Sequence, residues 1–107
     1  MQQPNIDWAN LPFGYLPTDY NVRCYYRNGA WGEIETSSSE YVNIHMAATC
    51  LHYGQEAFEG LKAYRCPDGK IRAFRIEENA ARMQHTAQGI LMAEMPTDKF
   101  CEMVRRV

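Results

Sequence analysis

The sequence has 107 residues, 46% of them hydrophobic and 22% charged, and its formal net charge is -2. This length fits one domain, and the small negative charge gives no electrostatic reason to expect a nucleic acid as partner. No apolar stretch approaches the roughly 18 residues of a membrane span, and the N-terminal residues lack the basic flank and apolar centre of a secretory signal. We therefore predict a soluble, cytoplasmic protein.

The first part of the chain predicts an extended arm followed by a hairpin. Residues 1–20 hold three of the five prolines and are expected to be irregular. Apolar and polar side chains alternate over residues 22–27, and Asn28-Gly29 supplies the residues that a tight primed turn requires. Residues 30–35 would then return antiparallel to the first strand.

The middle of the chain predicts a second hairpin. Its strands are expected at residues 57–65 and 70–75, because residues 66–69 place proline second and glycine fourth, as a type I turn prefers. Smaller elements are expected before it, namely a polar connection at residues 36–39, a short strand at 41–45 and a helical turn within 46–55.

A helix is predicted over residues 76–90 by apolar residues that recur at spacings of four and three. They are Ile76, Ala80, Met83, Ala87 and Ile90. This is the stripe of a helix packed on a sheet, and Glu77 and Glu78 suit the positive end of its dipole. The predicted fold class is therefore α+β, with a mainly antiparallel sheet and helices packed on one of its faces.

A last helix is expected from Pro96, which bars continuation of the preceding helix, with Thr97 as its cap. Its apolar face would carry Phe100, Met103 and Val107. No stop signal follows this face. The alternatives are a helix that frays at a natural terminus and a longer protein of which this chain is a fragment.

The cysteines and histidines show no metal-binding pattern. No C-x-x-C pair occurs, and no cysteine has zinc-like spacing to a histidine, which predicts reduced, packed thiols and no metal site. His52 lies beside the segment with the strongest site signal, so its role stays open. The residues concerned are Cys24, Cys50, Cys66, Cys101, His45, His52 and His85.

That segment is residues 51–65, LHYGQEAFEGLKAYR, which combines two glycines, two acids, a lysine, an arginine and three aromatics. A segment built only for burial would not carry so many polar groups, because each would need a partner inside. We expect a chain that turns past a pocket, with Tyr53 and Phe58 as walls. Gly54 and Gly60 would allow a close approach of the backbone.

The same segment resembles the N-terminal domain of branched-chain amino acid aminotransferases, class IV enzymes that use pyridoxal 5'-phosphate (PLP). The similarity covers roughly residues 11–96. It rests on Phe13-Gly14 with Thr18-Asp19, LHY at 51–53, FEGLKAYR at 58–65, IRAFR at 71–75 and NAARM at 79–83. The resemblance implies an arm at residues 1–20 and an incomplete small α/β domain at 21–107, with a PLP-lysine domain beyond the chain.

The resemblance also implies roles for individual residues. Arg82 matches the arginine that binds the cofactor phosphate, and a guanidinium offers bidentate, permanently charged donors for that purpose. Tyr53, Phe58 and Phe13 match positions that line the substrate pocket, where an aliphatic side chain needs an apolar wall. The Schiff-base lysine of the family lies downstream of Val107. No catalytic residue is therefore expected here, and the chain alone is expected to be inactive and without bound PLP.

The other residues of the motif receive structural roles. For Glu59 and Lys62 an ion pair is the better interpretation than a catalytic role. Arg75 shares a helical face with Arg82, and it could support the site or form an exposed ion pair.

The implied reaction transfers the amino group of leucine, isoleucine or valine to 2-oxoglutarate and forms glutamate, and the implied assembly is a homodimer. Two other class IV enzymes, D-amino acid aminotransferase and aminodeoxychorismate lyase, remain alternatives. So does a free-standing, non-catalytic domain that binds a small ligand or a partner protein.

Overall fold

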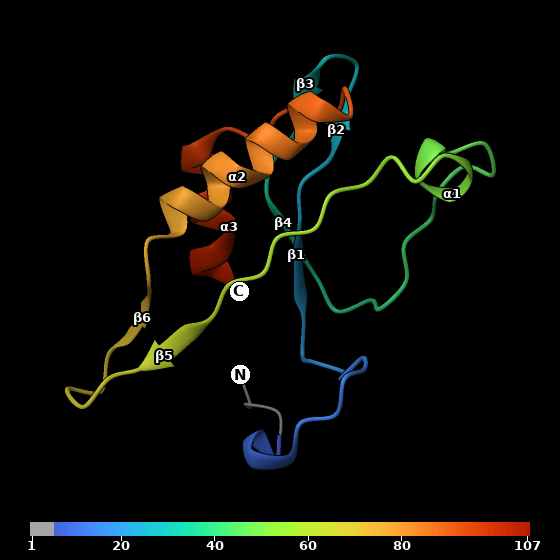
Figure 1. Ribbon diagram of the computed structural model, residues 1–107. Helices are drawn as coiled ribbons and strands as arrows, with labels where there is room; N and C mark the ends of the chain where they lie inside the picture. The colour runs from blue at the N-terminus through green and yellow to red at the C-terminus, as the bar shows by residue number, and fades with distance from the viewer. Residues whose placement is uncertain (1–5) are drawn as a thin grey trace. The chain divides into compact units, whose positions relative to one another are not determined.

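The computed structural model describes residues 6–107 (Figure 1). The described chain divides into two compact units, one formed by residues 6–43 with Val107 and the other by residues 44–106. Helices and short antiparallel strand pairs make up the structure, so the α+β class is confirmed. The predicted single sheet is wrong, because the strands form three separate two-stranded ladders.

The first unit contains a short 3-10 helix and two strand pairs. The helix is capped by Asp7, whose Oδ1 accepts the Ala9 N–H at 3.2 Å. β1 pairs with β4, and β2 pairs with β3. The elements are η1 (Trp8–Asn10), β1 (Asn21–Arg23), β2 (Tyr26–Arg27), β3 (Ala30–Trp31) and β4 (Glu35–Ser37).

The hairpin predicted at Asn28-Gly29 is confirmed. Both residues have positive φ, 53° and 80°, as a type I′ turn requires, and the rings of Tyr26 and Trp31 meet across the strands with centroids 5.1 Å apart. Between the two ladders, residues 32–34 of the returning strand oppose only residues 24 and 25. This extra residue is a bulge, and it separates one long hairpin into two short ladders.

Two predictions downstream of this hairpin are wrong. Thr36 and Ser37 belong to β4 and not to a loop, and residues 41–45 form no strand. The reason lies in Arg23, whose Nη2 donates to the carbonyl oxygens of Ser39 at 2.7 Å and Tyr41 at 3.0 Å. A side chain thus takes backbone acceptors that a further strand would have used.

The second unit contains the predicted helical turn, the second hairpin and both long helices. The turn at residues 66–69 is confirmed, with the Gly69 N–H donating to the Cys66 carbonyl at 2.9 Å. The strand predicted at 57–65 is wrong over residues 57–62, which do not belong to any strand; only residues 63–65 do. The elements are α1 (Thr49–His52), β5 (Ala63–Arg65), β6 (Ile71–Ala73), α2 (Ile76–Gly89) and α3 (Thr97–Arg106).

The core of the second unit lies between α2 and α3, which pack against each other. The predicted stripe of α2 supplies three of its buried residues, and α3 supplies the fourth; they are Ile76, Ala80, Ala87 and Cys101. The stripe is therefore confirmed, but its predicted partner, a sheet, is wrong. In α3 the buried residue is Cys101, whereas Val107, predicted on the apolar face of this helix, follows its last residue and is 74% exposed.

The predicted cap of α3 is also wrong. Thr97 is the first helical residue, and its Oγ1 accepts a hydrogen bond of 3.1 Å from Gln84 Nε2. Among residues 6–107, no helix combines the length and the apolar character needed to cross a membrane.

Candidate functional site

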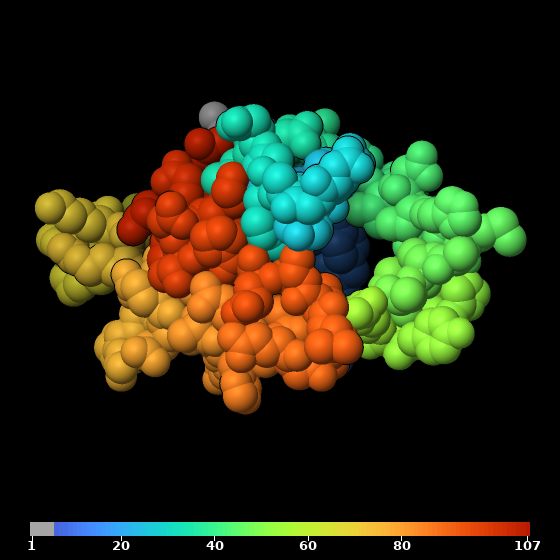
Figure 2. All heavy atoms as spheres, turned by 90° about the horizontal axis from the view of Figure 1, so that it is seen from above, coloured from blue at the N-terminus to red at the C-terminus, as the bar shows by residue number. Residues whose placement is uncertain are grey.

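An open hollow of about 580 Å³ lies along the exposed face of α2. Its lining recurs every three or four residues, so one face of the helix and the residues just before it form the wall. In Figure 2 the atoms of α2, in orange, form an open surface. The lining residues are Phe74, Arg75, Glu78, Asn79, Ala81, Arg82 and His85.

Arg75 stands at the start of α2, where it occupies the left-handed region with φ 50° and ψ 51°. Its carbonyl accepts the Glu78 N–H at 3.0 Å, and its guanidinium lies 3.2 Å from the Glu78 carboxylate. The guanidinium also lies 5.9 Å from the centroid of the Phe74 ring. Few residues other than glycine adopt this conformation, and it marks the bend at which α2 begins, with Arg75 lining the hollow.

Arg82 binds a carboxylate from the segment that precedes β5. Its Nε lies 2.9 Å from both oxygens of Glu59, and its Nη2 also donates to Oε1. Asn79 adds a bond of 2.8 Å to the same oxygen and one of 3.2 Å to the carbonyl of Gly60. The Glu59 side chain is 6% exposed, whereas the Arg82 side chain is 67% exposed.

This contact changes the acidity of both groups. Hydrogen bonds from Arg82, and then from Asn79, hold the pKa of Glu59 below its ordinary value of 4.5. The same carboxylate raises the pKa of the Arg82 guanidinium. Both shifts favour the charged forms, so the ion pair persists at neutral pH.

Acid is expected to break this ion pair. Since the pKa of Glu59 is lower in the folded state, its contribution to the free energy of unfolding is present above the unfolded value near 4.5. It is lost as the pH falls through the lower, folded value. Comparing the pH dependence of the unfolding midpoint between the natural chain and Glu59→Gln measures this. Parallel curves below pH 5 would contradict the expectation.

The ion pair expected for Glu59 therefore forms, but its partner is Arg82. Lys62 lies exposed on the neighbouring stretch, and no ion pair of Lys62 exists among residues 6–107. None of the three lysines, Lys62, Lys70 and Lys99, lines the hollow.

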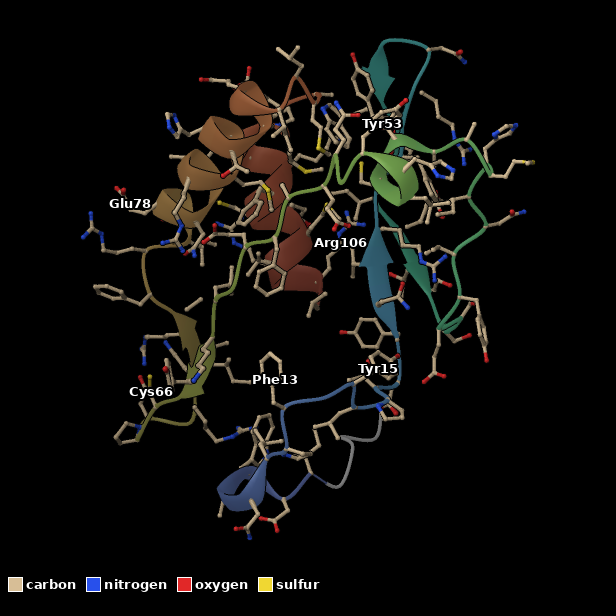
Figure 3. The ribbon with its side chains drawn as sticks, turned by 45° about the vertical axis from the view of Figure 1, so that its right-hand side comes forward. Phe13, Tyr15, Tyr53, Cys66, Glu78 and Arg106 are labelled. Carbon is tan, nitrogen blue, oxygen red and sulfur yellow. The ribbon has the colours of Figure 1, made fainter. Side chains whose placement is uncertain are left out.

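The aromatic residues predicted to form pocket walls are exposed. Tyr53 follows α1 and is 85% exposed, Phe58 is 90% exposed, and Phe13, in the first unit, is fully exposed. Figure 3 shows Tyr53 beside α1 and Glu78 on the first turn of α2, well apart within the second unit. Neither Tyr53 nor Phe58 lines the hollow, and their role as substrate contacts stays a prediction.

The glycines of this segment act differently from the prediction. Among residues 6–107, apart from its chain neighbours, no atom lies within 4 Å of a Cβ added to Gly54, so no close backbone approach occurs there; its φ of 65° is what favours glycine. At Gly60 the nearest atoms belong to the ring of Phe58, at 3.8 Å.

Besides Arg75 and Arg82, five residues that were not predicted as site residues line the hollow: Phe74, Glu78, Asn79, Ala81 and His85. Of these, Asn79 shares the helical face of Arg75 and Arg82 by its spacing in the sequence. The signal was present in the spacing. Continuing the polar face of Arg75 and Arg82 by one further turn reaches His85, and Phe74 precedes the same face.

Over about nine-tenths of its length, the chain is homologous to curated proteins from bacteria, plants and fungi that are named aminotransferases or transaminases. Relatives at 41–46% identity over most of the chain are named branched-chain amino acid aminotransferases, so the resemblance given by the motifs is confirmed.

The identities to individual relatives are high. The branched-chain-amino-acid aminotransferase of Haemophilus influenzae is 46% identical over 103 residues, which are 96% of this chain and 30% of the relative. That of Helicobacter pylori is 42% identical over 90% of the chain, and the chloroplastic branched-chain amino acid aminotransferase 2 of Humulus lupulus is 46% identical over 94%. The chain spans about a quarter to a third of the length of these relatives. No protein-family model matches the chain.

Proposed function

We propose that this chain is the N-terminal part of a PLP-dependent branched-chain amino acid aminotransferase. The whole enzyme would transfer the amino group of leucine, isoleucine or valine to 2-oxoglutarate as a cytoplasmic homodimer. The observation that carries the proposal is 46% identity to such an enzyme over 96% of the chain. A hollow that presents an arginine already held by a carboxylate supports it.

The donor set of the hollow fits the phosphate of PLP. Arg75 and Arg82 are permanent cations, and His85 adds a ring N–H donor on the same face of α2. Both N–H bonds of the Asn79 amide are already used by Glu59 and Gly60. Phosphate is a tetrahedral, multiply charged acceptor, and two of its oxygens can accept the parallel N–H bonds of a guanidinium, which a lysine cannot offer. Arg82 is the residue proposed to anchor it.

PLP, when bound, would supply the electron sink for amino transfer through its conjugated pyridinium ring. This chain supplies binding and orientation. No lysine lines the hollow, so the Schiff-base lysine is proposed to come from beyond Val107. Tyr53, Phe58 and Phe13 are proposed to form the apolar wall for the aliphatic side chain of the substrate, with the Tyr53 hydroxyl as a polar handle.

The balance of burial supports a larger assembly. The buried core consists of four small or medium side chains, while many large apolar side chains are more than half exposed. Large apolar side chains left exposed in each unit are available to an interface. The proposed second domain and the second subunit would cover it. Examples are Trp8, Phe13, Tyr41, Met46, Tyr53, Phe58 and Phe74.

The test is the amino donor that the full-length protein accepts. With PLP and 2-oxoglutarate present, we expect glutamate to form from L-leucine, L-isoleucine and L-valine and not from D-alanine. Preference for D-alanine would instead identify a D-amino acid aminotransferase. A parent protein that ends at Val107 and forms no glutamate would favour the non-catalytic binding domain.

A further inference from the structure

One carboxylate fixes the orientation of Arg82. Glu59 is nearly buried, and burying an ionised carboxylate is unfavourable unless it is paired and hydrogen-bonded. The Nε of Arg82 and the amide of Asn79 supply those bonds at 2.8–2.9 Å, together with Nη2. The guanidinium is thus bound side-on, along the edge formed by Nε and Nη2.

This leaves the other edge of the guanidinium available. Among residues 6–107, no hydrogen bond or ion pair uses Nη1 of Arg82, and Arg82 itself lines the hollow. A guanidinium has five N–H donors in a planar fork, so binding one anion side-on leaves Nη1 and Nη2 for a second anion end-on. The plane set by Glu59 then decides where that second anion sits.

The carboxylate is also attached to the segment with the predicted substrate wall. Glu59 directly follows Phe58, and Asn79 of α2 binds the carbonyl of Gly60 at 3.2 Å. The bonds from α2 therefore hold residues 59 and 60 at the helix from which Arg82 projects. The same contacts therefore position Arg82 and the backbone next to Phe58.

We propose that Glu59 is a positioning residue for cofactor binding, which holds Arg82 so that its free edge meets the phosphate. The inference rests on the proposed role of Arg82. It differs from the opposite possibility, in which Glu59 competes with the phosphate for the guanidinium. Positioning requires that loss of Glu59 weakens binding of the phosphorylated ligand, whereas competition requires that the loss strengthens it.

The experiment measures the affinity of the full-length apoprotein for PLP and for pyridoxal, which lacks the phosphate, by absorbance titration. For Glu59→Gln we expect PLP binding about tenfold weaker, the scale on which supporting partners of a ligand-binding residue act, and pyridoxal binding unchanged. Glu77→Gln, on the same helix but outside the lining of the hollow, is the matched control and should bind PLP normally.

Two further variants make the result decisive. Glu59→Asp keeps the charge, but its side chain is one methylene too short to accept from Arg82 at both carboxylate oxygens. The positioning role therefore predicts weaker PLP binding for this variant. It also tests the role if Glu59→Gln does not fold. In an Arg82→Ala background, Glu59→Gln should cause no further loss, since its effect passes through Arg82. Additive losses would overturn the proposal.

The outcomes separate the two proposals. If Arg82→Ala weakens PLP binding while both Glu59 variants bind PLP as tightly as the natural protein or more tightly, only the positioning role is overturned. If Arg82→Ala leaves PLP affinity unchanged, the phosphate role of Arg82 fails, and the inference about Glu59 fails with it.

Discussion

Arg82→Ala in the full-length protein is expected to weaken PLP retention by about 10- to 100-fold, the effect of losing hydrogen bonds to a charged group. The phosphate would lose its fork-shaped partner, and the hollow would keep only Arg75 as a permanent cation. The PLP retention of Arg82→Lys should lie between that of Arg82→Ala and that of the natural protein, because an ammonium keeps the charge but cannot donate along two parallel directions. Dialysis followed by absorbance of the remaining cofactor measures the loss.

A second effect of this substitution has to be separated from the first. Without Arg82, the nearly buried Glu59 carboxylate keeps only the bond from Asn79, so the fold itself loses stability. Affinity for pyridoxal distinguishes the two effects, because a distorted fold would lower it and a lost phosphate partner would not. Arg72→Ala is the control, since Arg72 also pairs with a carboxylate, Asp68 at 2.7 Å, but lies outside the hollow. Equal PLP loss in both variants would contradict the role of Arg82.

Local chemistry was sufficient to predict the turns and the helices of this fold. Asn28-Gly29 and the Cys66 to Gly69 turn each depend on the backbone preferences of their own residues. The α2 stripe depends on a helical period that is written in the sequence. These elements are found where they were predicted because no distant contact decides them.

Distant contacts decide the elements that were predicted incorrectly. Residues 57–62 were predicted as part of a strand, yet the Asn79 amide binds the Gly60 carbonyl, and Arg82 binds the Glu59 side chain. The α2 stripe does not reveal whether a sheet or α3 covers it, since both present apolar surface. Tertiary contacts override local preference at both places.

The site was predictable only in part for the same reason. Arg82 could be named through the family motif, and the polar face of α2 through its spacing. The pairing of Arg82 with Glu59 could not be predicted, because the two residues lie 23 positions apart, whereas Lys62 is much nearer to Glu59 in sequence. The side-on contact that underlies the positioning proposal appears only in three dimensions.

A substitution in the core of the second unit is expected to lower the stability of the fold. Ala80 is 1% exposed on the face of α2 that packs against α3, so no space remains for a larger side chain. Ala80→Leu is expected to lower the free energy of unfolding by about 1–3 kcal/mol through overpacking. The denaturant midpoint of the apoprotein measures this change.

Ala81→Leu is the matched control, because the same substitution one residue along α2 points into the open hollow and should change stability by less than about 0.5 kcal/mol. The two variants would act on the site by different routes. Ala80→Leu would disturb the packing that holds α2, whereas Ala81→Leu would reduce the hollow directly and weaken PLP binding without unfolding the helix. Equal loss of stability in both variants would mean that α2 does not have one buried and one open face.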